Sequence, residues 1–227
     1  IDDRIRPDRY ASLSMRWVWR EAQAEVYFEG GKNKFQTFKE FIMVPEKDAA
    51  IVLGFTKLFN LSRPDNFLEV GVELTKLAQT TDYSLAELNS WYIDQNIRHG
   101  YTHNGQWIGA GIGPGSNLAT IDLSWLNTDH KLGLVLEREL HNSDFYYLAF
   151  EHNRDWNKYW IDYTIGIKGY TQMKDLMIQG RIVRINSLNY QWIHERVPGE
   201  PYISPGNDLI NWNFNLSLIY HLPTKDR

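Results

Sequence analysis

"INWNFNLSLIY", residues 210–220, is the stretch that decides the fold. Its apolar and aromatic side chains stand at the even positions: Ile210, Trp212, Phe214, Leu216, Leu218 and Tyr220. The odd positions hold asparagine or serine, with Ile219 as the one exception. Successive side chains of a β-strand point to opposite faces, whereas a helix would spread these residues around its circumference. The stretch therefore predicts a strand with one apolar and one polar face.

The same alternation recurs along most of the chain. It is regular over residues 11–19, 22–29, 67–75, 131–139 and 159–168, and less regular over 49–59, 117–126, 144–152 and 175–188. With 210–220, these segments predict about ten strands. Turn-forming clusters follow some of them: "EGGKN" (29–33), "SRPDN" (62–66) and "RVPGEPYISPGND" (196–208). Only "SLAELNSWYI" (84–93) has a short helical pattern. We therefore expect an all-β protein of antiparallel strands, organised as one domain over residues 1–227.

Two features of these strands favour a transmembrane β-barrel of the outer-membrane type. Several strands reach the length of about nine to eleven residues that a tilted strand needs to cross a bilayer. Trp17, Trp19, Tyr159 and Tyr220 lie near strand ends, where aromatic rings form the girdles of membrane barrels. The polar face also carries charges, which a water-filled interior keeps solvated. A soluble sheet with an outward polar face would show the same alternation, so the pattern leaves both architectures open.

Composition narrows the classes of function. The chain has 227 residues, no cysteine and a formal charge of -4, and its mean hydropathy is -0.47. Without cysteine there is no disulfide, no thiolate zinc site and no cysteine nucleophile. The negative charge gives no reason to expect nucleic acid as a partner. No stretch approaches the roughly eighteen consecutive apolar residues of a transmembrane helix.

The glycine-rich stretch "HGYTHNGQWIGAGIGPGS" (99–116) is the main candidate for a functional segment. A phosphate-binding loop must open a helix, but Pro114 interrupts this stretch and the residues that follow alternate as a strand. His99 and His103 share a face in either a helix or a strand, yet the sequence suggests no third metal ligand. We predict no metal and no cofactor here, and expect a long loop with tight turns instead.

This loop combines aromatic rings with amide side chains. Sugar rings stack on aromatic faces, while amides hydrogen-bond to hydroxyl groups. The candidate ligand-binding residues are Tyr101, His103, Asn104, Gln106 and Trp107. The alternative is a structural plug packed inside the lumen.

"GYTHNGQWIGAGIGPGS" (100–116), followed by a strand, resembles the Wzi family of outer-membrane capsule assembly proteins. So do, in order, "FIMVPEKDAAIVLGFTKL" (41–58), "LERELHNSDFYY" (136–147) and "RINSLNYQW" (184–192). The resemblance implies a β-barrel in the outer membrane of a Gram-negative bacterium that binds or organises capsular polysaccharide without catalysis. Family members are larger barrels, so the chain would supply only the C-terminal part, about ten strands. Its implied partners are surface polysaccharide, outer-membrane lipid and other envelope chains.

Two other functions remain open from the residues alone. The first is a membrane-bound glycan hydrolase, because Glu69 with Glu73, and Glu137 with Glu139, share strand faces. Residues two apart on a strand lie roughly 6.5–7 Å apart, within the range of glycosidase carboxylates. The second is a soluble β-sandwich or lipocalin-like binding module.

Overall fold

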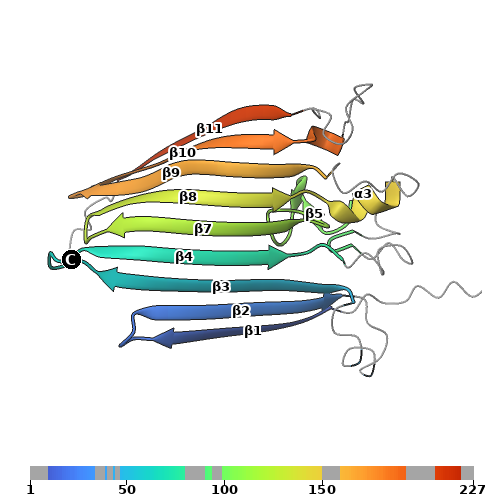
Figure 1. Cartoon of the computed structure of the whole chain (residues 1–227), viewed down its shortest axis with the longest axis horizontal. Coiled ribbons are helices and arrows are strands. Elements are labelled where there is room, and N and C mark those ends of the chain that lie inside the picture. The colour runs from blue at the N-terminus through green and yellow to red at the C-terminus, as the bar shows by residue number, and fades with distance from the viewer. Residues whose placement is uncertain are drawn as a thin grey trace, which may run out of the picture.

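The fold is a single antiparallel sheet of nine long strands, seen in a computed structural model (Figure 1). The structure describes residues 10–33, 39, 43, 47–79, 90–93, 99–149, 159–192 and 208–220. The strands of the sheet are β1 (Tyr10–Trp19), β2 (Ala24–Asn33), β3 (Ala49–Asn60), β4 (Phe67–Lys76), β7 (Asn117–Leu126), β8 (His130–Leu140), β9 (Ile161–Met173), β10 (Leu176–Leu188) and β11 (Leu209–Tyr220). Each strand pairs with the next long strand in the chain, so the sheet is a continuous meander.

The two ends of the sheet differ in their connections. Residues 20–23, 61–66, 127–129 and 174–175 make the short turns at one end. Gln23, Asp65 and Lys174 adopt positive φ angles in these turns. The connections at the other end are long, and they carry helix α3 (Ser143–Ala149) and the two-stranded β5–β6 hairpin (Figure 1). We call this the long-connection end.

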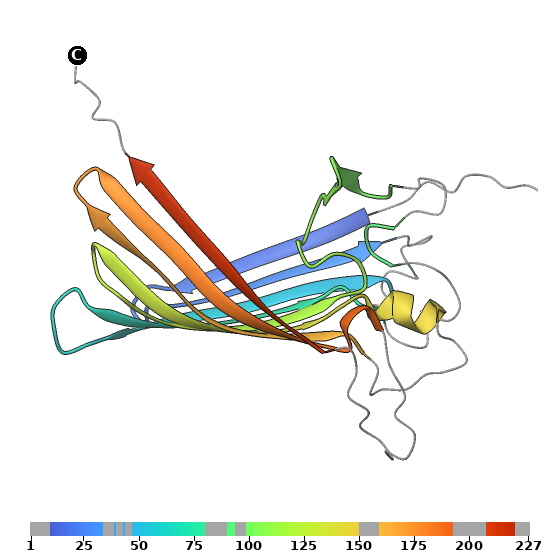
Figure 2. The same ribbon diagram turned by 90° about the horizontal axis from the view of Figure 1, so that it is seen from above.

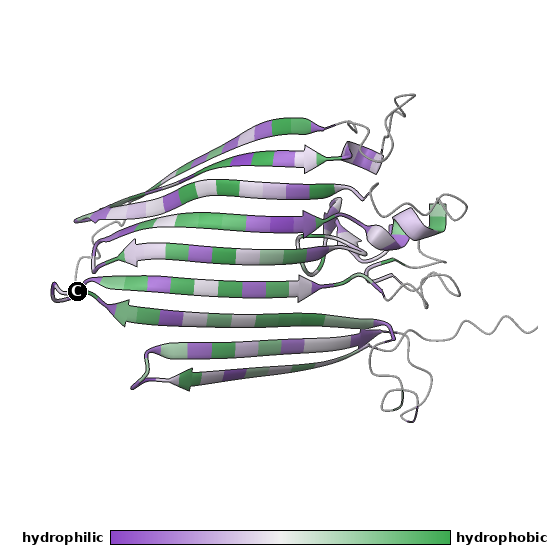
Figure 3. Ribbon diagram, in the orientation of Figure 1, coloured by the Kyte–Doolittle hydropathy of each residue, from purple (hydrophilic) through white to green (hydrophobic). Residues whose placement is uncertain are grey.

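The register divides the sheet into two chemically distinct faces. Leu134 pairs with Leu123 on one side and Ile167 on the other, and the neighbouring row pairs Val135 with Asp122. The alternation is visible along the strands in Figure 3. We call the two sides the apolar face and the polar face. The apolar face carries Leu13, Met15, Trp17, Leu53, Phe55, Val72, Leu74, Ile121, Leu123, Leu132, Leu134, Leu136, Ile165, Ile167, Ile182, Trp212, Phe214, Leu216 and Leu218.

The apolar face is the exposed one. Leu13 is 62% exposed, Phe214 69% and Leu216 72%, and Leu134 near the middle of the sheet still has 38%. Within the part of the chain that the structure describes, no second layer covers these side chains. Burial is instead greatest on the polar face and at the long-connection end, where Val135, Val183 and Tyr146 are 2% exposed.

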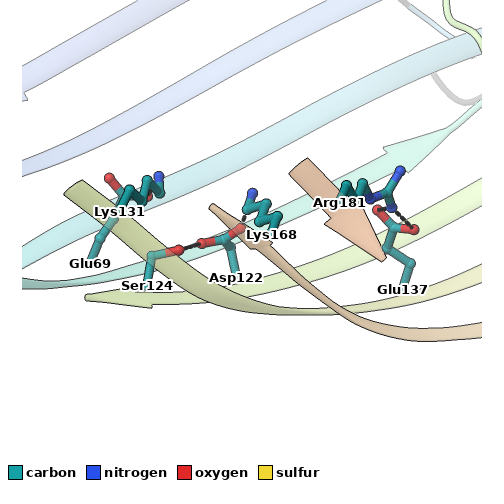
Figure 4. A network of polar contacts seen from close by, with 7 residues as sticks. All are labelled: Glu69, Asp122, Ser124, Lys131, Glu137, Lys168 and Arg181. Carbon is teal, nitrogen blue, oxygen red and sulfur yellow. Dashed lines mark hydrogen bonds and ion pairs between the residues drawn. The ribbon is translucent and has the colours of Figure 1, made fainter. Parts of the chain in front are cut away.

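The sheet curls into an open trough, with β1 and β11 rising toward the same side (Figure 2). The polar side chains lie inside this curve (Figure 4). Strands β1 and β11 each have a single neighbour among the described strands, so the sheet is not closed. None of the described helices is long and apolar enough to cross a membrane.

Most strand predictions are confirmed, but one predicted turn and one predicted strand are wrong. "EGGKN" is not a turn, because β2 continues through Gly30 and Gly31 to Asn33. Gly31 pairs normally with its neighbours, and the bare backbone leaves room for the ring of Trp91. The run 144–152 begins as helix α3 rather than as a strand, since the Asn142 side chain caps it by accepting a hydrogen bond from the Phe145 N–H at 3.2 Å.

The remaining expectations concern connections. "SRPDN" forms the turn between β3 and β4, as predicted. Of the expected helix 84–93, residues 84–89 lie outside the described residues, and 90–93 form a turn without helix. The stretch 196–208 lies outside them apart from Asp208.

Candidate functional site

The predicted sugar-binding residues lie together on one small hairpin. Strand β5 (Thr102–His103) pairs with β6 (Gln106–Trp107), and Asn104 and Gly105 form the turn between them. Both turn residues have positive φ, 48° and 78°, as a two-residue hairpin turn requires. From the sequence we expected a loop here. Asn-Gly between short polar and aromatic segments is the signal that predicts the hairpin.

Aromatic contacts fix this hairpin to the rest of the molecule. The ring of Tyr101 lies 5.3 Å from that of Tyr10 on β1, and the ring of Trp107 lies 6.3 Å from that of Tyr92. The Tyr92 hydroxyl accepts a hydrogen bond from the Ala110 N–H at 3.0 Å. The Tyr92 carbonyl accepts one from the Tyr101 N–H, also at 3.0 Å. The hairpin is therefore anchored on both sides.

Sequence reasoning missed Tyr10 and Tyr92 as supports of this site. Tyr92 lies in the segment 84–93, which has a helical pattern, and Tyr10 precedes the first alternating run. Neither position has a local signal, because the contacts join β1 and two parts of one long connection. Trp91 belongs to the same cluster, with its ring centroid 6.2 Å from that of Tyr10.

The hairpin presents its polar groups to solvent. His103, Asn104 and Gln106 are exposed. Tyr101 is 46% and Trp107 38% exposed, so each ring has one covered and one open part. Asn104 Nδ2 lies 3.3 Å from His103 Nε2. An open aromatic surface beside amide donors and acceptors is chemically suited to a sugar.

The polar face carries a ladder of ion pairs (Figure 4). Lys131 Nζ lies 2.7 Å from Glu69 Oε1, which joins β8 to β4. Arg181 donates to both carboxylate oxygens of Glu137, at 2.9 and 2.8 Å, which joins β10 to β8. Lys168 on β9 pairs with Asp122 on β7. Each pair passes over one intervening strand, so the ladder links strands that are not hydrogen-bonded to each other.

A tyrosine makes a similar link nearer to β1. The Tyr27 hydroxyl on β2 donates to Glu73 Oε2 on β4. Between them lies Gly54 on β3, where an added Cβ would stand 1.9 Å from the Tyr27 ring. The missing side chain thus gives the tyrosine its path across β3.

These contacts engage the carboxylates considered for glycan hydrolysis. Glu69 pairs with Lys131, Glu73 accepts from Tyr27, and Glu137 pairs with Arg181. The remaining carboxylate, Glu139, lies 3.4 Å from His141 Nδ1. Among the described residues, no group of three or more acidic or histidine side chains is placed to hold a metal ion.

A buried carboxylate ties the long connections to one another. Asp144 accepts hydrogen bonds from the Ser90 hydroxyl at 2.7 Å and from the Gln79 N–H at 2.9 Å. Burial raises the pKa of Asp144 above its usual value, and these two hydrogen bonds oppose that effect. The adjacent Ser143 hydroxyl donates to the Gly115 carbonyl at 3.1 Å. The end of the glycine-rich stretch is thus fastened to α3.

Comparison with protein-family models, with curated proteins and with solved structures finds no match.

Proposed function

We propose that the chain forms part of a transmembrane antiparallel β-barrel in the outer membrane of a Gram-negative bacterium. In this proposal it binds or organises surface polysaccharide, such as capsule, without catalysis. The observation that carries the proposal is the polarity of the two faces. The apolar face is exposed and uncovered, whereas the ion pairs lie on the concave side. This is the reverse of a soluble protein, and it suits lipid outside and water inside.

Strand length and connection length support this orientation. The long strands run from 10 to 13 residues, enough for a tilted strand to cross the hydrocarbon core. Outer-membrane barrels have short periplasmic turns and longer extracellular loops. By that rule the long-connection end, with the β5–β6 hairpin, faces the cell exterior, where polysaccharide is met.

The open edges also fit a larger barrel. Among the described strands, the outer edges of β1 and β11 have no pairing partner, and in a bilayer each unpaired backbone group would cost several kcal/mol. Further strands are therefore needed to complete the wall, as in the larger barrels of the Wzi family. The resemblance of the glycine-rich stretch to that family is what favours capsular polysaccharide over other ligands. Outer-membrane lipid and other envelope chains are the remaining expected partners.

The two alternatives are less well supported by these observations. A soluble sandwich or lipocalin-like module would cover its apolar face with protein, but Trp212 and Phe214 are 59% and 69% exposed. A hydrolase needs one carboxylic acid able to give up its proton. Glu69 and Glu137 are instead each engaged in an ion pair, with Lys131 and Arg181 respectively.

The test has two arms. The first asks whether the purified protein needs detergent to remain monodisperse, and the proposal expects that it does. The second measures retention on immobilised capsular polysaccharide, for which we expect Trp107→Ala and Asn104→Ala to weaken binding. Trp125→Ala is the matched control, because Trp125 is also 38% exposed but lies on β7 near the short turns. Equal retention by all variants would reduce the hairpin to a structural element, and polymer shortening on incubation would favour the hydrolase.

A further inference from the structure

Charge is distributed one-sidedly between the two faces of the sheet. Every acidic side chain of the nine long strands lies on the polar face: Glu25, Glu29, Glu69, Glu73, Asp122, Glu137, Glu139 and Asp162. On the apolar face, the charged side chains of these strands are all cationic. Of these, Arg138 and Arg184 lie in the halves of β8 and β10 that adjoin the long connections. Among the described residues, neither arginine makes an ion pair or a hydrogen bond.

Arg138 and Arg184 flank the same groove. Arg138 pairs in register with Tyr163 on β9, and Arg184 pairs with Ile165, two residues further along that strand. Strand spacing and rise put the two arginine Cα atoms about 12 Å apart. The groove between them has a volume of about 450 Å³, and Ile121, Ile165 and Tyr163 are part of its lining. Two guanidinium groups therefore lie beside one partly apolar groove.

A second groove continues along the same two strands. Gly169 on β9 and Gly180 on β10 are direct partners, so neither contributes a side chain to the face. The resulting groove has a volume of about 430 Å³ and is lined by Leu132, Ile167, Ile182, Phe214 and Leu216, among others. Its glycines lie about 13 Å from Arg184 along β10. We call this second groove the glycine furrow. It lies on the same exposed surface as Arg138 and Arg184.

From this juxtaposition we propose that the outward surface of β8–β11 binds an amphiphile with a phosphate headgroup. Arg138 and Arg184 hold the phosphate, and the glycine furrow takes an acyl chain. Arginine binds phosphate bidentately, and a lipid-facing strand tolerates it best near the interface, where headgroup phosphates lie. This inference rests on the proposed membrane insertion, because only then does the apolar face meet lipid.

The test uses the protein in a non-ionic detergent, with bound lipid counted by native mass spectrometry. The probes are dioleoyl phosphatidic acid and dioleoylglycerol, which share their acyl chains and differ in the phosphate. We expect the first to bind about a hundred-fold more tightly, the effect of two charge-assisted contacts. Arg138→Gln and Arg184→Gln should each reduce that preference by about ten-fold, the effect of one such contact. Lys57→Gln is the control, a cation of the same face near the short turns.

The furrow has its own variant. An added Cβ at Gly180 meets nothing closer than 3.4 Å, so Gly180→Val fills the groove without a severe clash. It should weaken both lipids alike and leave the preference for phosphate unchanged. A clash at Gly169 makes that position unsuitable, since its Cβ would stand 2.4 Å from the Lys131 carbonyl oxygen. Far-UV circular dichroism checks that each variant keeps its sheet.

Three results would overturn the inference. The double arginine variant could keep the preference, Lys57→Gln could abolish it equally, or inorganic phosphate could compete fully with the lipid, which would make this a site for the free anion. In each case the detergent requirement would stand, and the proposed function with it. Should the protein stay monodisperse in plain buffer and bind neither lipid, membrane insertion and the lipid site would both fail.

Discussion

Replacing Phe214 by lysine separates a lipid-facing sheet from a water-facing one. Phe214 lies at the middle of β11, on the apolar face, with 69% of its surface exposed. In water, substitution at so open a surface position changes the free energy of unfolding by about 0.5 kcal/mol or less. At the midplane of a bilayer, a lysine on a lipid-facing strand costs about 2–4 kcal/mol. The two environments therefore differ by more than ten-fold in the folding equilibrium constant.

Asn213→Lys supplies the matched control. Asn213 neighbours Phe214 on the same strand but belongs to the polar face, paired with Val183. Both variants would be refolded into phospholipid vesicles and unfolded in guanidinium chloride, with tryptophan fluorescence as the signal. We expect the midpoint to fall markedly for Phe214→Lys and to stay near wild type for Asn213→Lys. Equal midpoints for the two variants would refute the assignment of the apolar face to lipid.

Three further perturbations test the interior and the long connections. Gly54→Ala should lower the unfolding free energy by about 1–3 kcal/mol, because its methyl group would collide with the Tyr27 ring. Gly71→Ala should be tolerated, since its Cβ would stand 3.5 Å from the nearest atom. Chemical denaturation of both variants checks this. Glu137→Gln breaks a partly exposed ion pair and should cost at most about 1 kcal/mol, a loss that shrinks as salt rises, so a larger salt-independent effect would contradict the reasoning. Burial raises the folded pKa of Asp144, so its contribution to stability is present at low pH and is lost as pH rises from about 4 through that raised pKa. Thermal unfolding from pH 4 to pH 7 should show this loss in the wild type, and a slope unchanged in Asp144→Asn would count against it.

The strands could be predicted because they obey a local rule. An alternation with a period of two is visible in the residues themselves, and the boundaries of β7 (Asn117–Leu126) agree with the predicted segment 117–126. The exceptions arise where a non-local contact or a cap overrides the local signal. Paired glycines read as a turn, yet Gly30 and Gly31 continue β2 because their partners on β1 and β3 hold them extended.

The candidate site was predicted only in part. The five hairpin residues lie within seven consecutive positions, 101–107, so sequence proximity brings them together. Their supports, Tyr10 and Tyr92, come from other elements and become neighbours only through the fold. The partners in the ion-pair ladder could not be predicted from the sequence either. Arg181 and Glu137 meet across β9, and nothing in their sequence separation indicates that they pair.

The ion pairs that pass over a strand bear on how this wall finds its correct alignment. Alternating polarity penalises a slip of one residue, since every side chain would change sides, but it tolerates a slip of two. A two-residue shift of β8 against β4 would keep the apolar side chains on the apolar face, yet it would carry Lys131 about 7 Å away from Glu69. The ion pairs thus distinguish between registers that all keep the apolar side chains on the same face. They favour one register of strand pairing over its two-residue alternatives.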